Sequence, residues 1–216
     1  MSKGKSSALW AILIPVAIAA VLTVPVTTLY LFFRAFTNPT GSMEKTLLVG
    51  DYLVAKVRDI GPIQRGEIVV FHYPVDPGQT FIKRVLGVPG DRVRMINKQF
   101  YLNGTALKEP YIHHATDYVD PYRDNFPSQP NTMTYPGAQA ALAMLRHDVV
   151  NGEVVVPPGK YFVLGDNRDL SLDSRYWGFV DRREIFGKPL FIYCSIDEPG
   201  SGAPRLRPER IFKRIE

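Results

Sequence analysis

The sequence contains a single cysteine, Cys194, among 216 residues. One cysteine excludes an internal disulfide and any zinc site built from cysteines. Cys194 ends the apolar run 189–194, so we expect a buried thiol without a chemical role. No other spacing of residues suggests a metal site, and we expect neither a metal nor a cofactor.

Long runs of one charge are also missing. The net charge is +5, and no run of lysine and arginine exceeds two residues. Nucleic-acid-binding proteins commonly gather basic residues into blocks, so we do not expect nucleic acid as a partner. A mild, dispersed positive charge instead suits a solvated surface or one that lies near anionic lipid headgroups.

Histidine is scarce as well, and this matters because a serine triad needs a histidine base. The four histidines are His72, His113, His114 and His147. His72 alternates with apolar residues in a predicted strand, and the other three fall in a polar segment, 105–150. None is convincing as a general base, and adjacent histidines rarely converge on one metal ion.

What the sequence does contain is one long segment without charge. Residues 9–33 are 25 uncharged residues, enough to cross a bilayer as a helix. A cleaved signal peptide is the alternative, since Ala17 and Ala19 have the spacing of a cleavage site. The apolar run continues 14 residues past Ala19, however, which is longer than such a peptide needs. We therefore favour a permanent single-pass anchor.

The orientation of this anchor follows from its flanking charges. Lys3 and Lys5 precede it, whereas Arg34 alone follows it closely. Positive residues favour the cytoplasmic side of a membrane span. We expect residues 1–8 in the cytoplasm, the anchor in the cytoplasmic membrane, and the rest of the chain on the periplasmic or extracellular side.

After the anchor the sequence predicts a mainly β protein. Apolar residues make up 45% of the chain, and 18 prolines with 17 glycines imply many turns. Short apolar runs with turns every 8–12 residues are typical of all-β domains. The predicted strands are 46–57, 67–73, 80–88, 92–96, 99–102, 153–156, 160–164 and 184–193, with one helix at 138–147. We expect a catalytic β domain from 34–104 and 151–216, and an inserted subdomain or long loops at 105–150.

Two residues stand out as candidates for chemistry. Ser42 lies in a turn made by Pro39 and Gly41, and Lys83 shares a strand face with apolar residues. Burial lowers the pKa of a lysine by up to about 3–5 units, which would make Lys83 a usable base for Ser42. The alternatives are an ordinary turn serine and a lysine that reaches the surface or pairs with an acid.

Four stretches of the sequence together resemble bacterial type I signal peptidase. They are PTGSMEKTL at 39–47, GEIVVF at 66–71, FIKRVLGVPGD at 81–91 and GDNRDLSLDSRYWGFV at 165–180. They occur in the order of that family and follow an N-terminal anchor. Two positions depart from the family pattern: Asn38 replaces a branched apolar residue, and Lys45 replaces a proline.

The resemblance implies a catalytic role for each matching residue. Ser42 would be the nucleophile and Lys83 the general base, with an acyl-enzyme intermediate. The Thr40 hydroxyl and the Ser42 backbone N–H would form the oxyanion hole. Ser171 would orient Lys83, and Asp173 and Arg175 would pair and hold their loop. Residues for the substrate pockets at positions −3 and −1 would be Phe36, Asn38, Met43, Phe81 and Ile82.

The resemblance also implies a substrate and a place of work. The protein would be a membrane-bound, monomeric serine endopeptidase that cleaves signal peptides from exported preproteins, with those preproteins and the lipid bilayer as its partners. A Ser–Lys processing peptidase with a narrower substrate is a rival, which the anchor and the loop 165–180 disfavour. An inactive, membrane-tethered domain that only binds exported chains is another, and the full set of expected catalytic residues disfavours it.

Overall fold

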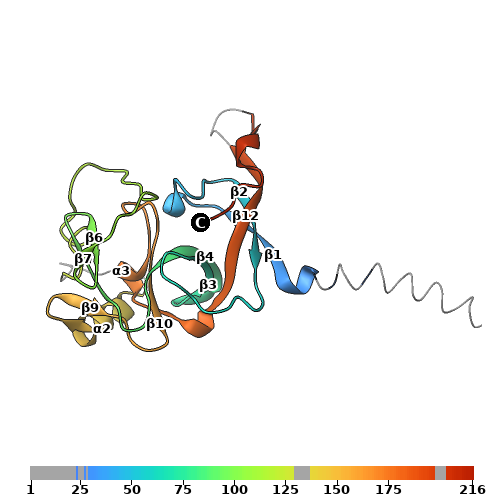
Figure 1. Ribbon diagram of the computed structural model, residues 1–216. Coiled ribbons are helices and arrows are strands. Elements are labelled where there is room, and N and C mark those ends of the chain that lie inside the picture. Colours follow the sequence, from blue (N-terminus) through green and yellow to red (C-terminus); the bar gives the residue numbers. More distant parts are fainter. Residues whose placement is uncertain (1–22, 24–26, 28, 129–136, 198–202) are drawn as a thin grey trace, which may run out of the picture.

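A computed structural model describes residues 23, 27, 29–128, 137–197 and 203–216, and it contains two antiparallel β-sheets (Figure 1). The first sheet has eight strands. Its spatial order is β1 (Phe33–Asn38), β2 (Asp51–Lys56), β12 (Ile185–Asp197), β3 (Ile68–Tyr73), β4 (Asp76–Gly87), β10 (Lys160–Leu164) and β11 (Val180–Asp181), with β13 (Arg205–Leu206) paired to β12.

The second sheet is smaller and lies at the left of Figure 1, on the side of the first sheet where β10 is. Its five strands follow the order β7 (Thr105–Ala106), β6 (Gln99–Leu102), β5 (Arg92–Ile96), β9 (Glu153–Val155) and β8 (Val149–Val150). The helical elements are α2 (Ala138–His147), α3 (Ser174–Trp177), and the 3-10 turns η1 (Gly41–Met43), η2 (Arg182–Glu184) and η3 (Pro208–Arg210).

The hairpin of β3 and β4 shows why both faces of the first sheet are buried. Side chains alternate between the faces of a strand, and where the two strands pair, at 68–71 and 81–84, most residues are apolar and buried. Val69 and Val85 pack on one face in a cluster that includes Trp177. Ile68 and Ile82 pack on the opposite face in a separate cluster. The hairpin is therefore a rigid support for any residue that it presents.

A third apolar cluster joins the two sheets. Phe162 and Leu164 of β10 belong to it together with Val93 of β5 and Phe100 of β6. The helix α2 adds Met144 to the same cluster. The second sheet is thus fixed to the first by a shared hydrophobic core.

The strand predictions from 67 to 102, from 153 to 164 and at 184–193 are confirmed, as is the helix at 138–147. Most of the predicted anchor, 9–33, lies outside the described residues. Residues 29–32 are helical and Phe33 begins β1, and the extent of the anchor stays a prediction. Among the residues that the structure describes, no helix has the length and apolar character needed to cross a membrane.

The sheet pairing also bears on the predicted insertion. The second sheet draws its strands from residues 92–106 and 149–155, so boundaries at 105 and 150 pass through it. The hairpin 92–102 has the same alternation as the strands of the first sheet, and the pattern alone does not show which sheet it joins. The division of the chain into a catalytic part and an insertion stays a prediction.

Candidate active site

Ser42 lies in the single turn η1, directly after the edge strand β1. Backbone hydrogen bonds from Glu44 N to the Gly41 carbonyl and from Leu47 N to the Met43 carbonyl (2.8 Å) fix this turn. Only 7% of Ser42 is exposed. The serine is therefore held in one place near the protein surface.

Lys83, which lies on β4 of the first sheet, contacts this serine. Its Nζ donates a hydrogen bond of 2.6 Å to Ser42 Oγ, and the lysine is 4% exposed. Burial lowers the pKa of Lys83 to about 8, although the nearby carboxylates of Asp173 and Asp166 oppose the shift. The structure thus brings together the two residues that the sequence singled out.

Thr40 and Ser171 were predicted to assist this pair. The hydroxyl oxygens of Thr40 and Ser42 are 3.1 Å apart, within hydrogen-bonding distance. Ser171 Oγ is buried and has no hydrogen-bond partner among the described residues. It lies close enough to Asp173 to help lower the pKa of that carboxyl, but no hydrogen bond links it to Lys83. The orienting role of Ser171 is therefore not visible as a direct bond.

Gly165 explains how the loop that carries Ser171 passes so close to the serine turn. A Cβ atom added at Gly165 would lie 2.3 Å from both Ser171 Oγ and the Ser42 carbonyl oxygen. No side chain fits in that space. In addition, Asn167 N donates a 3.1 Å hydrogen bond to the Ser42 carbonyl. The loop 165–173 thus packs directly on the backbone of Ser42.

Asp173 and Arg175 form a fully buried ion pair in this loop. Arg175 Nε and Nη2 each donate a 2.8 Å hydrogen bond to the Asp173 carboxylate. Burial alone raises the pKa of Asp173, but the Arg175 charge and its hydrogen bonds outweigh burial and hold that pKa below its ordinary value. Arg175 Nη2 also donates to the Arg168 carbonyl, which ties the two ends of the loop together.

A second buried ion pair joins the loop to β4. Arg84 follows Lys83 and points to the opposite side, where its Nε and Nη2 contact Asp166 at 2.9 and 2.8 Å. Thr46 Oγ1 donates to the same carboxylate. Asp166 therefore connects the loop, the strand β4 and the segment that follows Ser42.

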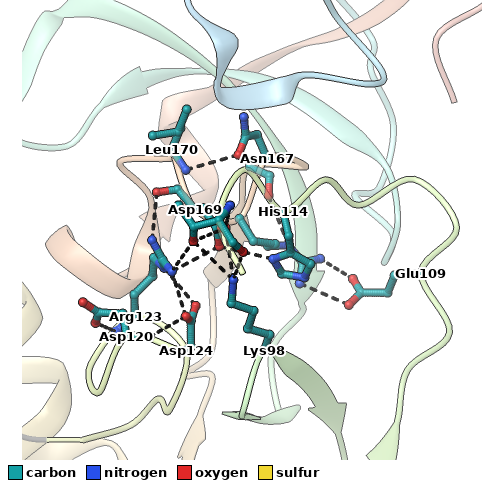
Figure 2. A network of polar contacts seen from close by, with 12 residues as sticks. Lys98, Glu109, His114, Asp120, Arg123, Asp124, Asn167, Asp169 and Leu170 are labelled. Carbon is teal, nitrogen blue, oxygen red and sulfur yellow. Dashed lines mark hydrogen bonds and ion pairs between the residues drawn. The ribbon is translucent and has the colours of Figure 1, made fainter. Parts of the chain in front are cut away.

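A larger group of polar contacts holds Asp169, in the middle of the loop (Figure 2). The Asp169 carboxylate accepts hydrogen bonds from Lys98 Nζ (3.1 Å) and from the backbone and hydroxyl of Thr116 (2.8 Å each). It also lies 3.2 Å from His114 Nδ1 and 3.3 Å from Arg123 Nη2. Burial alone raises the pKa of Asp169, but these partners outweigh it and hold the pKa far below its usual value. We call these five residues the Asp169 network.

Two buried arginines in this region have different partners. Arg175 pairs with Asp173, whereas Arg168 forms its ion pair with Glu109, from the predicted insertion. Arg168 Nη1 and Glu109 Oε2 are 3.1 Å apart. The segment 105–126 therefore contributes anchoring side chains to the loop, among them Glu109, His114, Thr116 and Arg123.

A cleft of about 850 Å³ opens above Ser42 and Lys83, between β1 and β4. Of the predicted pocket residues, Phe36, Asn38, Phe81 and Ile82 line it. Met43 does not, because it is completely buried in the core cluster that contains Ile82. The sequence analysis missed Ala35, Tyr52, Leu170, Leu172 and Tyr193, which also line the cleft. Among these, exposed leucines in an otherwise polar loop were a signal that could have been used.

Lys45, which stands where the family pattern has a proline, has an unusual backbone conformation. Lys45 has a φ of 84°, in the left-handed region, which proline cannot adopt. Its Nζ donates hydrogen bonds to the carbonyls of Pro110 (3.4 Å) and Ile112 (3.1 Å). The lysine thus ties the serine turn to the segment at 110–112.

Comparisons with known proteins show which family this sequence resembles. A sequence profile described as "Signal peptidase, peptidase S26" matches residues 8–194. The chain is 38% identical to signal peptidase I of Bacillus caldolyticus, over 78% of this chain and 84% of that protein. It is 34% identical to signal peptidase I of Pseudomonas fluorescens, over 76% of this chain, and the match spans 66% of that relative's length.

Among solved structures, the chain is similar to a signal peptidase I from Enterococcus faecalis V583, with a TM-score of 0.38 and 29% identity. That similarity covers 60% of this chain and 97% of the other.

Proposed function

Since this chain belongs to the peptidase S26 family of signal peptidases, we propose that it is a serine endopeptidase that removes N-terminal signal peptides from exported preproteins. In this proposal Ser42 is the nucleophile and Lys83 the general base. The observation that carries it is the 2.6 Å contact between Lys83 Nζ and Ser42 Oγ on the wall of the large cleft.

The lowered pKa of Lys83 supports its role as a base. With a pKa of about 8, roughly one lysine in ten is neutral at pH 7, compared with about one in a few thousand at the ordinary value. The neutral amine accepts the hydroxyl proton of Ser42 as Oγ attacks the scissile carbonyl carbon. No ion pair of Lys83 occurs among the described residues, so its lone pair becomes available without first breaking a salt bridge.

The attack creates a tetrahedral oxyanion, which needs hydrogen-bond donors. We assign this role to the Ser42 backbone N–H and the Thr40 hydroxyl, which already lies 3.1 Å from Ser42 Oγ. Each such donor contributes roughly 3–4 kcal/mol to the stability of the transition state. The C–N bond then breaks, and the protonated Lys83 gives its proton to the departing amine. An ester between Ser42 and the signal peptide remains.

Hydrolysis of this acyl-enzyme repeats the same steps with water as the nucleophile. Lys83 removes a proton from water, water attacks the ester carbonyl, and the Ser42 oxygen leaves with the proton that Lys83 returns. The buried Asp173–Arg175 pair fixes the loop beside Lys83 throughout, so the amine keeps its position. We assign to Ser171, 5% exposed and next to this pair, a supporting role in limiting the space open to the amine.

The cleft suits an extended peptide. β1 is the last strand at its end of the first sheet, and β4 pairs with β10 only from residue 84 to residue 87. Within the described part of the chain, residues 79–83 of β4 thus have one edge without a strand partner. A preprotein segment that adds to these edges would carry its scissile bond to Ser42. Phe36, Phe81 and Ile82 would shape small pockets for the residues at −3 and −1.

We further propose that the enzyme works at the surface of the cytoplasmic membrane, as a monomer. The uncharged run 9–33 is the anchor in this proposal, with the N-terminus in the cytoplasm. Ser42 follows Arg34 by eight residues, so an extended chain keeps it within roughly 30 Å of the anchor. A substrate whose apolar segment is still in the bilayer would then present its cleavage site at the right depth.

The test is cleavage of a preprotein, followed by mass spectrometry of the products. Wild type is expected to release a signal peptide with a defined end. Ser42→Ala and Lys83→Ala are expected to release none while keeping the melting temperature within a few degrees. Lys160→Ala serves as the matched control, because Lys160 is 40% exposed and pairs with Asp181 away from the cleft. Cleavage that survives Lys83→Ala would contradict the Ser–Lys mechanism.

A further inference from the structure

A second cavity, of about 350 Å³, lies where the chain enters the first sheet. It is formed at the start of β1 and just beyond the end of β2, and it shares no lining residue with the large cleft. Its walls have two characters. Positively charged or titratable side chains line one part and apolar ones another: Arg34, Arg58 and His72, against Tyr30, Leu31 and Phe186.

The two arginines of this cavity are held by the sheet but not neutralised. Arg34 is opposite Ala55 in the β1–β2 ladder, and Val57 N continues the ladder with a 2.8 Å bond to the Phe32 carbonyl. Arg58 follows directly, with its guanidinium 6.0 Å from the centre of the Phe32 ring. Neither arginine has a carboxylate partner in the part of the chain that the structure describes.

Several buried arginines elsewhere in the molecule have a carboxylate partner. Arg84, Arg168, Arg175 and Arg210 are buried, and each forms an ion pair with an aspartate or glutamate. The cavity pair is therefore a concentration of uncompensated positive charge. Its floor is rigid, because the His72 ring packs 4.5 Å from the Phe186 ring.

From these observations we infer that this cavity binds the phosphate of an anionic phospholipid headgroup. Paired guanidinium groups match the geometry of phosphate oxygens, and the volume is at the small end of ligand pockets. Tyr30 and Leu31, which line it, are 74% and 48% exposed, and the neighbouring Leu29 is 61% exposed. These apolar side chains favour a ligand with acyl chains over free phosphate. The uncharged run 9–33 ends at the same place.

This site adds a lipid-binding function to the proposed peptidase. It relies on the membrane location proposed above, but not on the chemistry of Ser42 and Lys83. A phospholipid held between Arg34 and Arg58 would fix the height of β1 above the bilayer, and β1 leads directly into the serine turn. Lipid binding and peptide cleavage can therefore be measured and can fail separately.

The experiment uses the full chain in detergent micelles. Native mass spectrometry would compare binding of phosphatidylglycerol and phosphatidylcholine to wild type and to the double variant Arg34→Gln/Arg58→Gln. Each basic residue near an anionic lipid contributes a factor of about five in affinity. We expect the double variant to lose about thirty-fold in affinity for phosphatidylglycerol and to bind phosphatidylcholine like wild type. Inorganic phosphate at millimolar concentration should not displace the lipid.

The matched control is Arg146→Gln/Arg205→Gln, which removes the same charge from exposed positions on α2 and β13. It should bind phosphatidylglycerol like wild type. An equal loss in both double variants would overturn the site, because only net charge would then matter. Displacement by inorganic phosphate would overturn the lipid assignment in favour of a simple anion site. If the first double variant does not fold, Arg58→Gln alone, outside the strand, should still lose about fivefold.

Cleavage of a soluble signal-peptide substrate separates the two proposals. Both double variants should cleave it at the wild-type rate, since neither alters the cleft. Wild type that binds phosphatidylglycerol selectively but cleaves nothing would refute the peptidase and leave the lipid site standing.

Discussion

Two buried charged groups, Lys83 on β4 and Asp169 in the loop 165–173, are treated by the protein in opposite ways. Lys83 contacts a neutral hydroxyl and has its pKa lowered to about 8. The Asp169 carboxylate is surrounded by Lys98, Arg123, His114 and Thr116, and its pKa is held far below the usual value. Both groups are more than nine-tenths buried.

Burial alone therefore does not set the state of a charged group. Desolvation disfavours the charged form of both side chains, but only Asp169 has enough direct partners to overcome it. Asp169 stays charged and anchors the loop. Lys83 keeps acids nearby but has no direct ion pair, and so it becomes neutral easily enough to accept a proton. The comparison separates a group that stabilises the fold from one that we propose takes part in the reaction.

The largest effect is expected for Lys83→Met, which tests the first of the two groups. We expect kcat/KM for a preprotein to fall by about a thousandfold or more, because the proposed general base is lost. Stability should not fall. The folded pKa of about 8 lies below that of the unfolded chain, so the amine destabilises the fold at neutral pH, an effect that fades as the pH rises from about 8 to 10.5. Denaturant unfolding at pH 7 checks this. A large loss of stability would mean that Lys83 has a structural role.

Asp169→Asn tests the second group and should have the opposite effect. Removing the carboxylate leaves buried cationic partners without compensation, and we expect a loss of about 3 kcal/mol in the free energy of unfolding. Asp117→Asn, at an exposed position of the predicted insertion, is the control and should change little.

The difference in stability between wild type and Asp169→Asn should depend on pH. Because the folded pKa of Asp169 is depressed, its contribution is complete above the unfolded pKa of about 4 and is lost as the pH falls further. Wild type should therefore lose more stability than Asp169→Asn on acidification below about pH 4. Equal acid sensitivity of the two proteins would contradict the assignment.

The pH dependence of turnover gives a third, smaller test. If Lys83 is the base, kcat/KM should rise about tenfold per pH unit up to a pKa of about 8 and then level off. The measurement is kcat/KM for a soluble signal-peptide substrate from pH 5 to pH 10. A profile set by a group near 6.5, and abolished by substitution of a histidine, would point to a different base.

The mildest test is His114→Gln. His114 contributes one contact, 3.2 Å from Asp169, and its side chain is 26% exposed. We expect a loss of about 1 kcal/mol in stability, typical of a single hydrogen bond, and an unchanged pH profile of turnover. A shift of that profile would show that the Asp169 network acts on the base as well as on the fold.

Much of this arrangement could be predicted from local pattern. The alternation of apolar residues around Lys83 indicated a buried strand position, and the strand, its burial and its contact with Ser42 are all present. The role of Ser42, by contrast, came from resemblance, because a glycine–serine turn carries no sign of chemistry on its own.

The Asp169 network could not be predicted in this way. Its members come from the turn between β5 and β6, the predicted insertion and the loop 165–173. Lys98 is 71 residues from Asp169 in the sequence. Local periodicity carries no information about such distant contacts. For the same reason the ion pair between Arg168 and Glu109, 59 residues apart, could not be predicted. Met43 was assigned to a pocket from the motif, but the turn η1 directs it into the core.

The close approach at Gly165 has a consequence for how the site tolerates change. A methyl group there would occupy the space of the Ser42 carbonyl and Ser171 Oγ. In a saturation library selected for activity, Gly165→Ala should therefore be depleted as strongly as Ser42→Ala or Lys83→Ala. Position 165 would appear indispensable in such a screen although it has no side chain, because what the site requires there is empty volume.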